Sequence, residues 1–297
     1  MQKWKDAAVR LWAWGARHGT GLLLAAAVLL VGGGALAAQG HGAPPPALAL
    51  EEPAVADAGE AESLPMVEAA TYPLDTRLTV VLDAGHGGHD PGAVSADGSE
   101  NEAEINQMMV DKVSGLLKAH EDTVRVVQAA QPGTYATTLA RANTAVRQQA
   151  ALLLSLHLNG DVSASTRGFQ CFPAPPGRVY HAESTRFSEL LVEQVRQTGI
   201  PILGTSGIYY CYYSWQGSKG YSKEILDAGA PGAQQPRTDE SFGVVEFGGC
   251  PAVLIEQWHI TNADDMALFH SDEGHEKMAR CIYLAICAYL EIEPVER

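Results

Sequence analysis

The chain has 297 residues, of which 46% are hydrophobic, and it carries 20 Lys and Arg against 35 Asp and Glu. This composition is typical of a globular protein and excludes a disordered or collagen-like one. The formal net charge of −15 disfavours a nucleic-acid partner, because no basic stripe is available to neutralise phosphates. The five cysteines are an odd number without a close-spaced pair, so we expect no disulfide.

The N-terminal part of the chain, up to Gly40, predicts export from the cytoplasm. Residues 1–18 form a basic segment that we expect on the cytoplasmic side of a membrane. Residues 19–40 carry no charge and are long enough to span a bilayer as a helix. They also contain Ala35-Leu36-Ala37, a small-residue pattern that a signal peptidase could cleave. We favour a transmembrane anchor over a cleaved signal peptide, and either one places the rest of the chain outside the cytoplasm.

Residues 41–75 are predicted to be a linker. They contain the run Pro44-Pro45-Pro46, many Ala, Glu and Asp, and no Lys or Arg. Such a segment cannot bury enough apolar surface to offset the entropy lost on ordering, so we interpret it as an extended spacer. A folded domain is expected over residues 76–292.

Within this domain, buried strands alternate with amphipathic helices. Short apolar runs predict strands at 78–82, 152–158 and 252–255, and helical spacing predicts helices over 102–118, 137–150, about 187–195 and 274–290. This alternation predicts a single α/β domain with a twisted, mostly parallel sheet flanked by helices. The stretch from Gly204 to Gly249 is the least regular and is a candidate substrate-facing insertion.

Two histidines lie at the ends of predicted strands. His86 follows the first strand in a loop rich in Gly, from Asp83 to Gly92, and His157 ends the strand over 152–158. The loop lacks the Gly-Lys-Ser/Thr ending and the dinucleotide spacing of phosphate-binding loops. A single histidine at a strand end is more often structural than a ligand. Two of them at the sheet edge where α/β proteins place their sites favour a metal site.

Carboxylates could complete such a site. A catalytic zinc keeps three protein ligands and one open position, and Glu100, Glu102 and Glu104 all lie where the loop enters a helix. Any of these could instead serve only the helix dipole. Glu256 ends the predicted strand over 252–255 without a cationic neighbour in sequence, so either catalysis or a structural ion pair must explain it.

Several segments together resemble the zinc-dependent N-acetylmuramoyl-L-alanine amidases of the type 3 family. They keep that family's order and approximate spacing over Thr76 to Ile292, and they are Leu82-Asp83-Ala84-Gly85-His86-Gly87-Gly88, Asp90-Pro91-Gly92-Ala93, Ser155-Leu156-His157-Leu158-Asn159, Arg167-Gly168-Phe169 and Pro251-Ala252-Val253-Leu254-Ile255-Glu256 with Asn262. The joint occurrence of these blocks is highly specific, although each block alone is weak.

The resemblance implies a cofactor, a site and a substrate. The zinc ligands of the family correspond to His86, Glu102 and His157, and its catalytic carboxylate corresponds to Glu256. Glu102 is chosen over its neighbours because Asn106 follows it by four residues, as in the family. The implied reaction is hydrolysis of the peptidoglycan amide between N-acetylmuramic acid and L-alanine. Peptidoglycan is then the partner, with the membrane as a second partner if the N-terminal segment is uncleaved.

Some features depart from the family pattern or leave alternatives open. Trp258-His259 stands where the family usually has Gly-Phe, and we expect His259 to pack rather than to act in the site. His89 is interpreted as a loop residue or an outer partner of the metal site. The aromatic cluster Tyr209 to Trp215 could stack on sugar rings or form an ordinary edge strand. The alternative functions are a zinc peptidase of stem peptides and an inactive peptidoglycan-binding scaffold.

Overall fold

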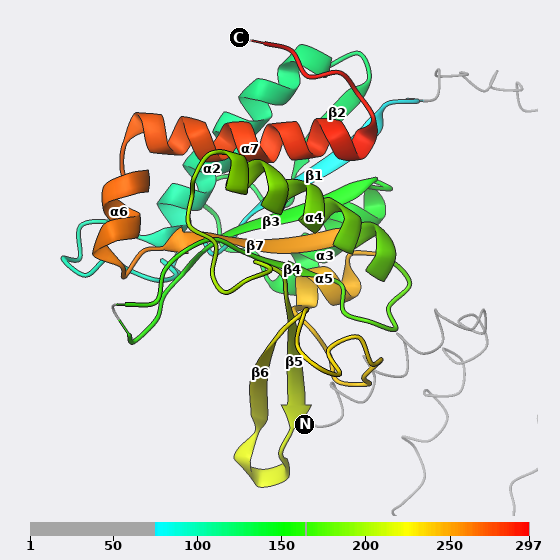
Figure 1. The fold of residues 1–297 in the computed structure, drawn as a ribbon. Coiled ribbons are helices and arrows are strands. Elements are labelled where there is room, and N and C mark those ends of the chain that lie inside the picture. The colour runs from blue at the N-terminus through cyan, green and yellow to red at the C-terminus, as the bar shows by residue number, and fades with distance from the viewer. Residues whose placement is uncertain (1–74, 164, 297) are drawn as a thin grey trace, which may run out of the picture. The chain divides into compact units, whose positions relative to one another are not determined.

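The computed structural model describes residues 75–163 and 165–296, which form the coloured domain of Figure 1. The expected basic segment 1–18, the anchor or signal peptide at 19–40 and the linker up to residue 74 lie outside these residues. Among the described residues, no helix is long and apolar enough to cross a membrane.

The centre of the domain is a five-stranded sheet with the order β2-β1-β3-β7-β4. Its strands are β1 Leu78–Ala84, β2 Val124–Gln128, β3 Leu152–Asn159, β4 Gln170–Pro173 and β7 Ala252–His259. The first four in this order run parallel, and β4 lies antiparallel to β7 at one edge. The predicted α/β domain with a mostly parallel sheet is therefore confirmed. Strands β2 and β4 were not predicted.

Helices cover both faces of this sheet (Figure 1). One face, which we call the first face, packs against three helices: α2 Glu102–Leu117, α4 His181–Gln197 and α7 Asp272–Leu290. The second face packs against α3 Thr138–Arg147 and α5 Gly243–Phe247. Side chains alternate along each strand, so Leu154 of β3 is buried in the first face and Leu153 in the second. The four predicted helices correspond to α2, α3, α4 and α7.

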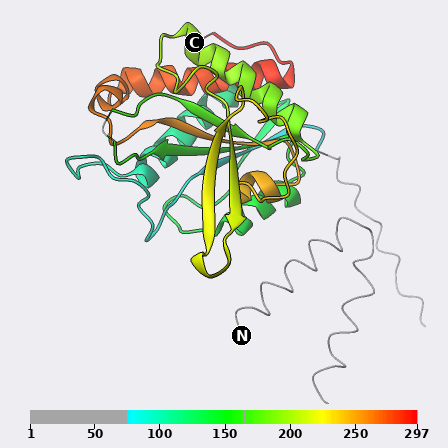
Figure 2. The ribbon, with the colours of Figure 1, turned by 60° about the horizontal axis from the view of Figure 1, so that its bottom comes forward.

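A second sheet stands apart from the first. Strands β5 Tyr209–Trp215 and β6 Tyr221–Asp227 pair antiparallel as a hairpin that projects from the domain (Figures 1 and 2). A short 3₁₀ helix, η2 Gly217–Lys219, forms its turn, and two further short elements, η1 Lys118–His120 and α6 Ala263–Phe269, lie after α2 and before α7. The stretch 204–249 is thus more regular than its composition suggested.

Strand β7 contains a bulge beside β3. Glu256 pairs with His157 and His259 pairs with Asn159, so three steps along β7 match two steps along β3. The predicted strand at 252–255 therefore continues to His259. The bulge resets the alternation of side chains, because Trp258 is buried in the first face whereas Glu256 lies two residues after Leu254 on the second face.

The five cysteines are all free and buried. No disulfide joins the described residues, and two apolar layers, one on each face of the sheet, hold the domain together.

A buried ion pair joins the sheet to α3. The Arg141 guanidinium donates to the Asp83 carboxylate at 2.6 Å, and it also bonds the carbonyl oxygens of Ala84 and His86. The second oxygen of Asp83 accepts from the Ser155 hydroxyl at 2.7 Å. Because one guanidinium holds two carbonyls on either side of Gly85, α3 fixes the path of the chain as it leaves β1.

We expect Arg141→Met to lower the free energy of unfolding by about 3–5 kcal/mol, because the Asp83 carboxylate would stay buried without its cation. Urea unfolding followed by circular dichroism measures this loss. The double substitution Asp83→Asn with Arg141→Met should recover part of it. A loss below about 1 kcal/mol for Arg141→Met, the size typical of an exposed pair, would show that the ion pair is not structural.

Candidate active site

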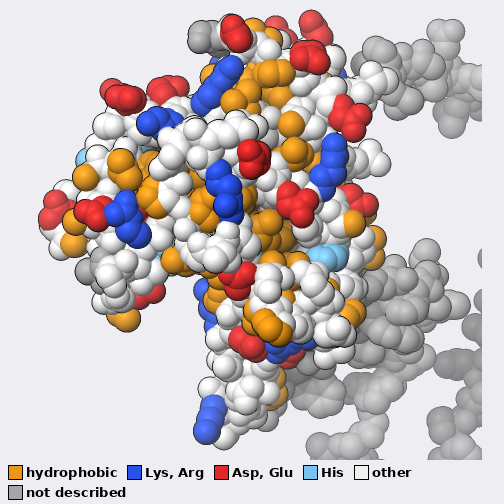
Figure 3. All heavy atoms as spheres, in the orientation of Figure 1, with side chains coloured by type: hydrophobic (Ala, Val, Ile, Leu, Met, Phe, Trp, Pro, Cys, Tyr) orange, Lys and Arg blue, Asp and Glu red, His pale blue; other side chains and the backbone are white. Residues whose placement is uncertain are grey.

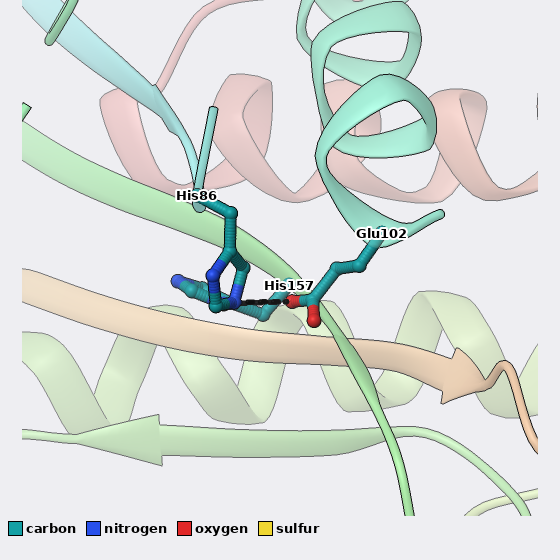
Figure 4. Close-up of side chains that lie close together, drawn as sticks. All are labelled: His86, Glu102 and His157. Atoms are coloured by element: carbon teal, nitrogen blue, oxygen red, sulfur yellow. Dashed lines mark hydrogen bonds and ion pairs between the residues drawn. The ribbon is translucent and has the colours of Figure 1, made fainter. Parts of the chain in front are cut away.

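Three side chains from separate elements meet at the carboxyl edge of the sheet (Figure 4). His86 follows β1, Glu102 is the first residue of α2, and His157 lies near the end of β3. Glu102 Oε1 lies 2.9 Å from His157 Nδ1 and 3.2 Å from His86 Nε2. One donor atom from each residue can be chosen so that all three lie within 4.8 Å of one another. The structure thus brings together His86, Glu102 and His157, the three residues that the family resemblance implied as ligands.

The backbone around β1 is shaped to admit these rings. A Cβ on Gly85 would lie 2.3 Å from the His157 ring, so only glycine leaves room for that ring. The next residue, His86, has a backbone φ of 64°, a value that residues other than glycine seldom adopt. The chain therefore turns sharply behind His157 and directs the His86 ring back towards Glu102.

Glu102 is fixed by backbone donors on both oxygens. Leu158 N–H donates to Oε1 at 3.0 Å and Ala93 N–H donates to Oε2 at 2.9 Å. The Asn106 amide, one helical turn on, lies 3.4 Å from Oε1. Asn101 caps the helix by accepting from Glu104 N–H, which sets where α2 begins. The carboxylate is thus held in place before any ligand arrives.

Asp90 orients the His86 ring from its far side. The Asp90 carboxylate lies 2.8 Å from His86 Nδ1 and also accepts from Gly92 N–H at 3.2 Å. A carboxylate on Nδ1 leaves Nε2 directed at the cluster, and outer carboxylates act in this way on many metal-binding histidines. Sequence analysis missed Asp90, although it lies in the same Gly-rich loop only four residues after His86.

The electrostatics of the cluster favour a cation. Hydrogen bonding to Glu102 raises the pKa of His86 to about 9. Burial opposes protonation of His157, but the Glu102 hydrogen bond and the nearby carboxylates outweigh it and raise its pKa. Burial acts to raise the pKa of Glu102, yet the two imidazoles hold that pKa well below its usual range. Two imidazole nitrogens and a carboxylate oxygen are also the donor types that zinc prefers, so these residues fit a zinc ion.

Glu256 lies beside this cluster. It pairs in register with His157 on the neighbouring parallel strand, and Gln170 of β4 lies on its other side. Burial raises the pKa of Glu256 to about 7, and the charge of His157 opposes this rise. Its Oε2 atom is buried and has no hydrogen-bond partner among the described residues. A carboxyl group with such a pKa and a free oxygen can exchange protons near neutral pH.

The other candidates from the sequence lie outside the cluster. Glu100 faces His270 at 3.5 Å, and Glu104 is exposed. His89 is exposed and its ring packs against Tyr135. His259 is fully buried with Nδ1 at 3.7 Å from Asp265, which agrees with a packing role.

The sequence model of one protein family, described as N-acetylmuramoyl-L-alanine amidase, matches residues 80–288. The chain belongs to this family. The match spans β1 to α7, so it includes all three members of the cluster and Glu256. The resemblance stated from the sequence motifs is therefore confirmed.

Individual amidases support the same assignment. A putative N-acetylmuramoyl-L-alanine amidase of Buchnera aphidicola is 23% identical over 215 residues, covering 71% of this chain and 96% of that protein. The amidase LytC of Bacillus subtilis is 26% identical over 211 residues, covering 71% of this chain and 35% of LytC. Among solved structures, the catalytic domain of CwlV from Paenibacillus polymyxa has a TM-score of 0.56 at 24% identity, covering 73% of this chain and 99% of that domain. This last likeness concerns the fold.

We expect Gly85→Ala to damage the amidase site more than the fold. The added methyl would press the His157 ring away from Glu102, while β1 and its neighbours keep their pairing. Metal content after dialysis should fall several-fold, whereas the far-ultraviolet circular dichroism should be unchanged. Gly98→Ala is a control for loop substitution, because a Cβ at Gly98 meets no atom within 4 Å. Full metal retention in Gly85→Ala would contradict this view of the site.

Proposed function

We propose that this amidase uses zinc to hydrolyse the amide bond between N-acetylmuramic acid and the L-alanine of peptidoglycan stem peptides. The observation that carries the proposal is the convergence of His86, Glu102 and His157, with Glu256 in register beside His157. Membership of the amidase family supplies the reaction class.

His86, Glu102 and His157 would hold the zinc ion. When bound, zinc polarises the scissile carbonyl and lowers the pKa of coordinated water towards neutrality. Asp90 keeps the His86 ring in the binding orientation, and the two backbone amides keep Glu102 in place. The chain would thus present its three donors already arranged, which reduces the cost of ordering them on binding.

Glu256 would move the protons. Its free Oε2 would accept a proton from the attacking water and then deliver that proton to the nitrogen of the leaving L-alanine. A pKa of about 7 suits both halves of this transfer, because the group is neither a strong acid nor a strong base at neutral pH. The proposed role therefore depends on the burial of Glu256 on β7.

We also propose an extracytoplasmic location, with the domain held near the membrane by residues 19–40. The cell-wall substrate of the family supports action outside the cytoplasm. The anchor itself rests on the N-terminal sequence, in which the basic segment 1–18 is followed by the uncharged segment 19–40.

Glu256→Gln should reduce release of stem peptides from purified peptidoglycan by roughly 10²–10⁴-fold, since the variant cannot transfer the proton. Its zinc content should equal that of the wild type, because Glu256 is not a ligand. Mass spectrometry of digested sacculi measures the products, and metal analysis measures zinc. Retained turnover in this variant would remove Glu256 from the mechanism.

The same digestion separates the alternatives. Free stem peptides indicate the amidase, shortened peptides indicate a peptidase, and binding without products indicates a scaffold.

Zinc affinity should rise with pH between about 7 and 9. The pKa of His86 in the metal-free protein is about 9 and that of His157 is raised, so below pH 9 zinc must displace protons. Calorimetry at pH 7 in two buffers of different ionisation enthalpy should detect proton release. His86→Ala should lose zinc, whereas His89→Ala, which alters an exposed histidine of the same loop, should keep it. A zinc affinity independent of pH over this range would contradict the proposed ligands.

A further inference from the structure

The β5–β6 hairpin has two faces with different surroundings. Tyr210 and Tyr212 lie on one face and are buried in a small cluster with Ala233 from the loop that follows β6. Tyr209 and Cys211 lie on the opposite face and are buried against the second face of the central sheet. The face with Tyr210 and Tyr212 belongs to the hairpin's own small core. The face with Tyr209 and Cys211 continues beyond the central sheet towards the turn of the hairpin.

Four side chains form this outer continuation, which we call the arm surface. Tyr213 pairs with Lys223, and Trp215 pairs with Tyr221. Directly paired residues of two antiparallel strands lie on the same face, and so do residues two positions apart along one strand. All four side chains therefore lie on the same face as Cys211. The Trp215 and Tyr221 rings contact each other at 5.0 Å and stay 63% and 53% exposed. The protein has a net charge of −15, yet its projecting hairpin, at the bottom of the view in Figure 3, carries an exposed aromatic pair and a lysine on one face.

Phe242 connects the arm surface to the strand that carries Glu256. Its ring packs on Phe172 of β4 at 5.2 Å and on Tyr213 at 6.0 Å, and Lys223 Nζ lies 4.9 Å above it. Phe172 pairs with Leu254 of β7, two residues before Glu256 on the same face. The Lys223 ammonium therefore lies over a ring that packs on β4, two residues along that strand from Gln170, the residue paired with Glu256.

Charge agrees with this placement. Burial raises the pKa of Glu256, and the positive charge of Lys223 is among the groups that oppose the rise. Burial likewise raises the pKa of Tyr213, and the charge of Glu256 adds to it. Lys223 forms no ion pair with any described residue, so its ammonium stays available to a ligand.

We propose that the arm surface binds the stem peptide of the substrate, and that Lys223 holds a carboxylate of that peptide. This inference rests on the proposed function, in which Glu256 delivers its proton to the nitrogen on the peptide side of the scissile bond. The peptide would therefore leave the scissile bond on the side of Glu256, so the arm surface, which lies beyond Glu256 and outside the metal cluster, would face the peptide. Stem peptides carry carboxylates, and the zinc proposed for the cluster serves the scissile amide, so a carboxylate farther along the peptide needs a separate cation. Lys223 supplies that cation.

The aromatic pair extends the same surface. Trp215 lies two residues beyond Tyr213, or about 7 Å along the strand. Exposed aromatic rings beside a charged anchor offer apolar area to the aliphatic parts of a peptide. Lys223 would therefore set the preference for an anionic peptide, and Trp215 would add affinity that is independent of charge.

The test compares two muramoyl tripeptides in the full chain carrying Glu256→Gln, which permits binding to be measured without turnover. One compound has free carboxylates on its peptide, and the other has all of these carboxylates amidated. Calorimetry should show roughly tenfold tighter binding of the carboxylate form. Lys223→Met should abolish the difference and Lys223→Arg should keep it. Lys219→Met, which removes an exposed lysine of the hairpin turn, should leave it unchanged.

Other results would overturn the proposal. Equal binding of the two compounds before any change at Lys223 would exclude a carboxylate contact. A preference that survives Lys223→Met would place that contact elsewhere. Trp215→Ala should weaken both compounds equally, and a loss confined to peptide-free glycan chains would show that the arm holds sugars. Release of stem peptides by the wild-type chain is measured separately, so failure of the amidase proposal is distinguishable from failure of this one.

Discussion

The Glu102 carboxylate is the contact on which the rest of the site depends. It receives backbone N–H groups from the loop after β1 and from β3, and both histidines approach the same oxygen. A buried carboxylate with four such partners ties together the start of α2, the loop after β1 and the end of β3. Burying it without them would be costly, so the fold and the site stabilise the same arrangement.

Much of the fold could be predicted because the central strands are short apolar runs. Residues 79–82, 152–156 and 252–255 are buried on both faces of the sheet, and continuous hydrophobicity is the pattern of such strands. Strand β2 escaped prediction because it lies at an edge and contains a half-exposed Arg125. Strand β4 escaped because it has only four residues and ends in Pro173. Its antiparallel direction depends on β7, which follows only after α4 and the whole hairpin.

The residues of the candidate site differ in how far the sequence alone could identify them. His86 and His157 follow apolar runs directly, so period-2 alternation and strand polarity were enough to bring them together. Helix-start propensity did not separate Glu102 from Glu100 and Glu104, because all three suit the start of a helix, and only the family's spacing to Asn106 favoured Glu102. What distinguishes Glu102 is the pair of N–H groups from Ala93 and Leu158, which only the folded chain brings there. The contacts of Arg141 are likewise invisible in the sequence, since they join α3 to the distant end of β1.

The burial of the thiols bears on the extracytoplasmic location proposed above. Burial raises the pKa of Cys211 to about 11 and that of Cys250 to about 12, so almost no reactive thiolate forms at neutral pH. Thiolate is the form that oxidants and disulfides attack. A wall enzyme built in this way would need neither cross-links nor a reducing environment, and its folding could proceed without the oxidative machinery that many exported proteins require.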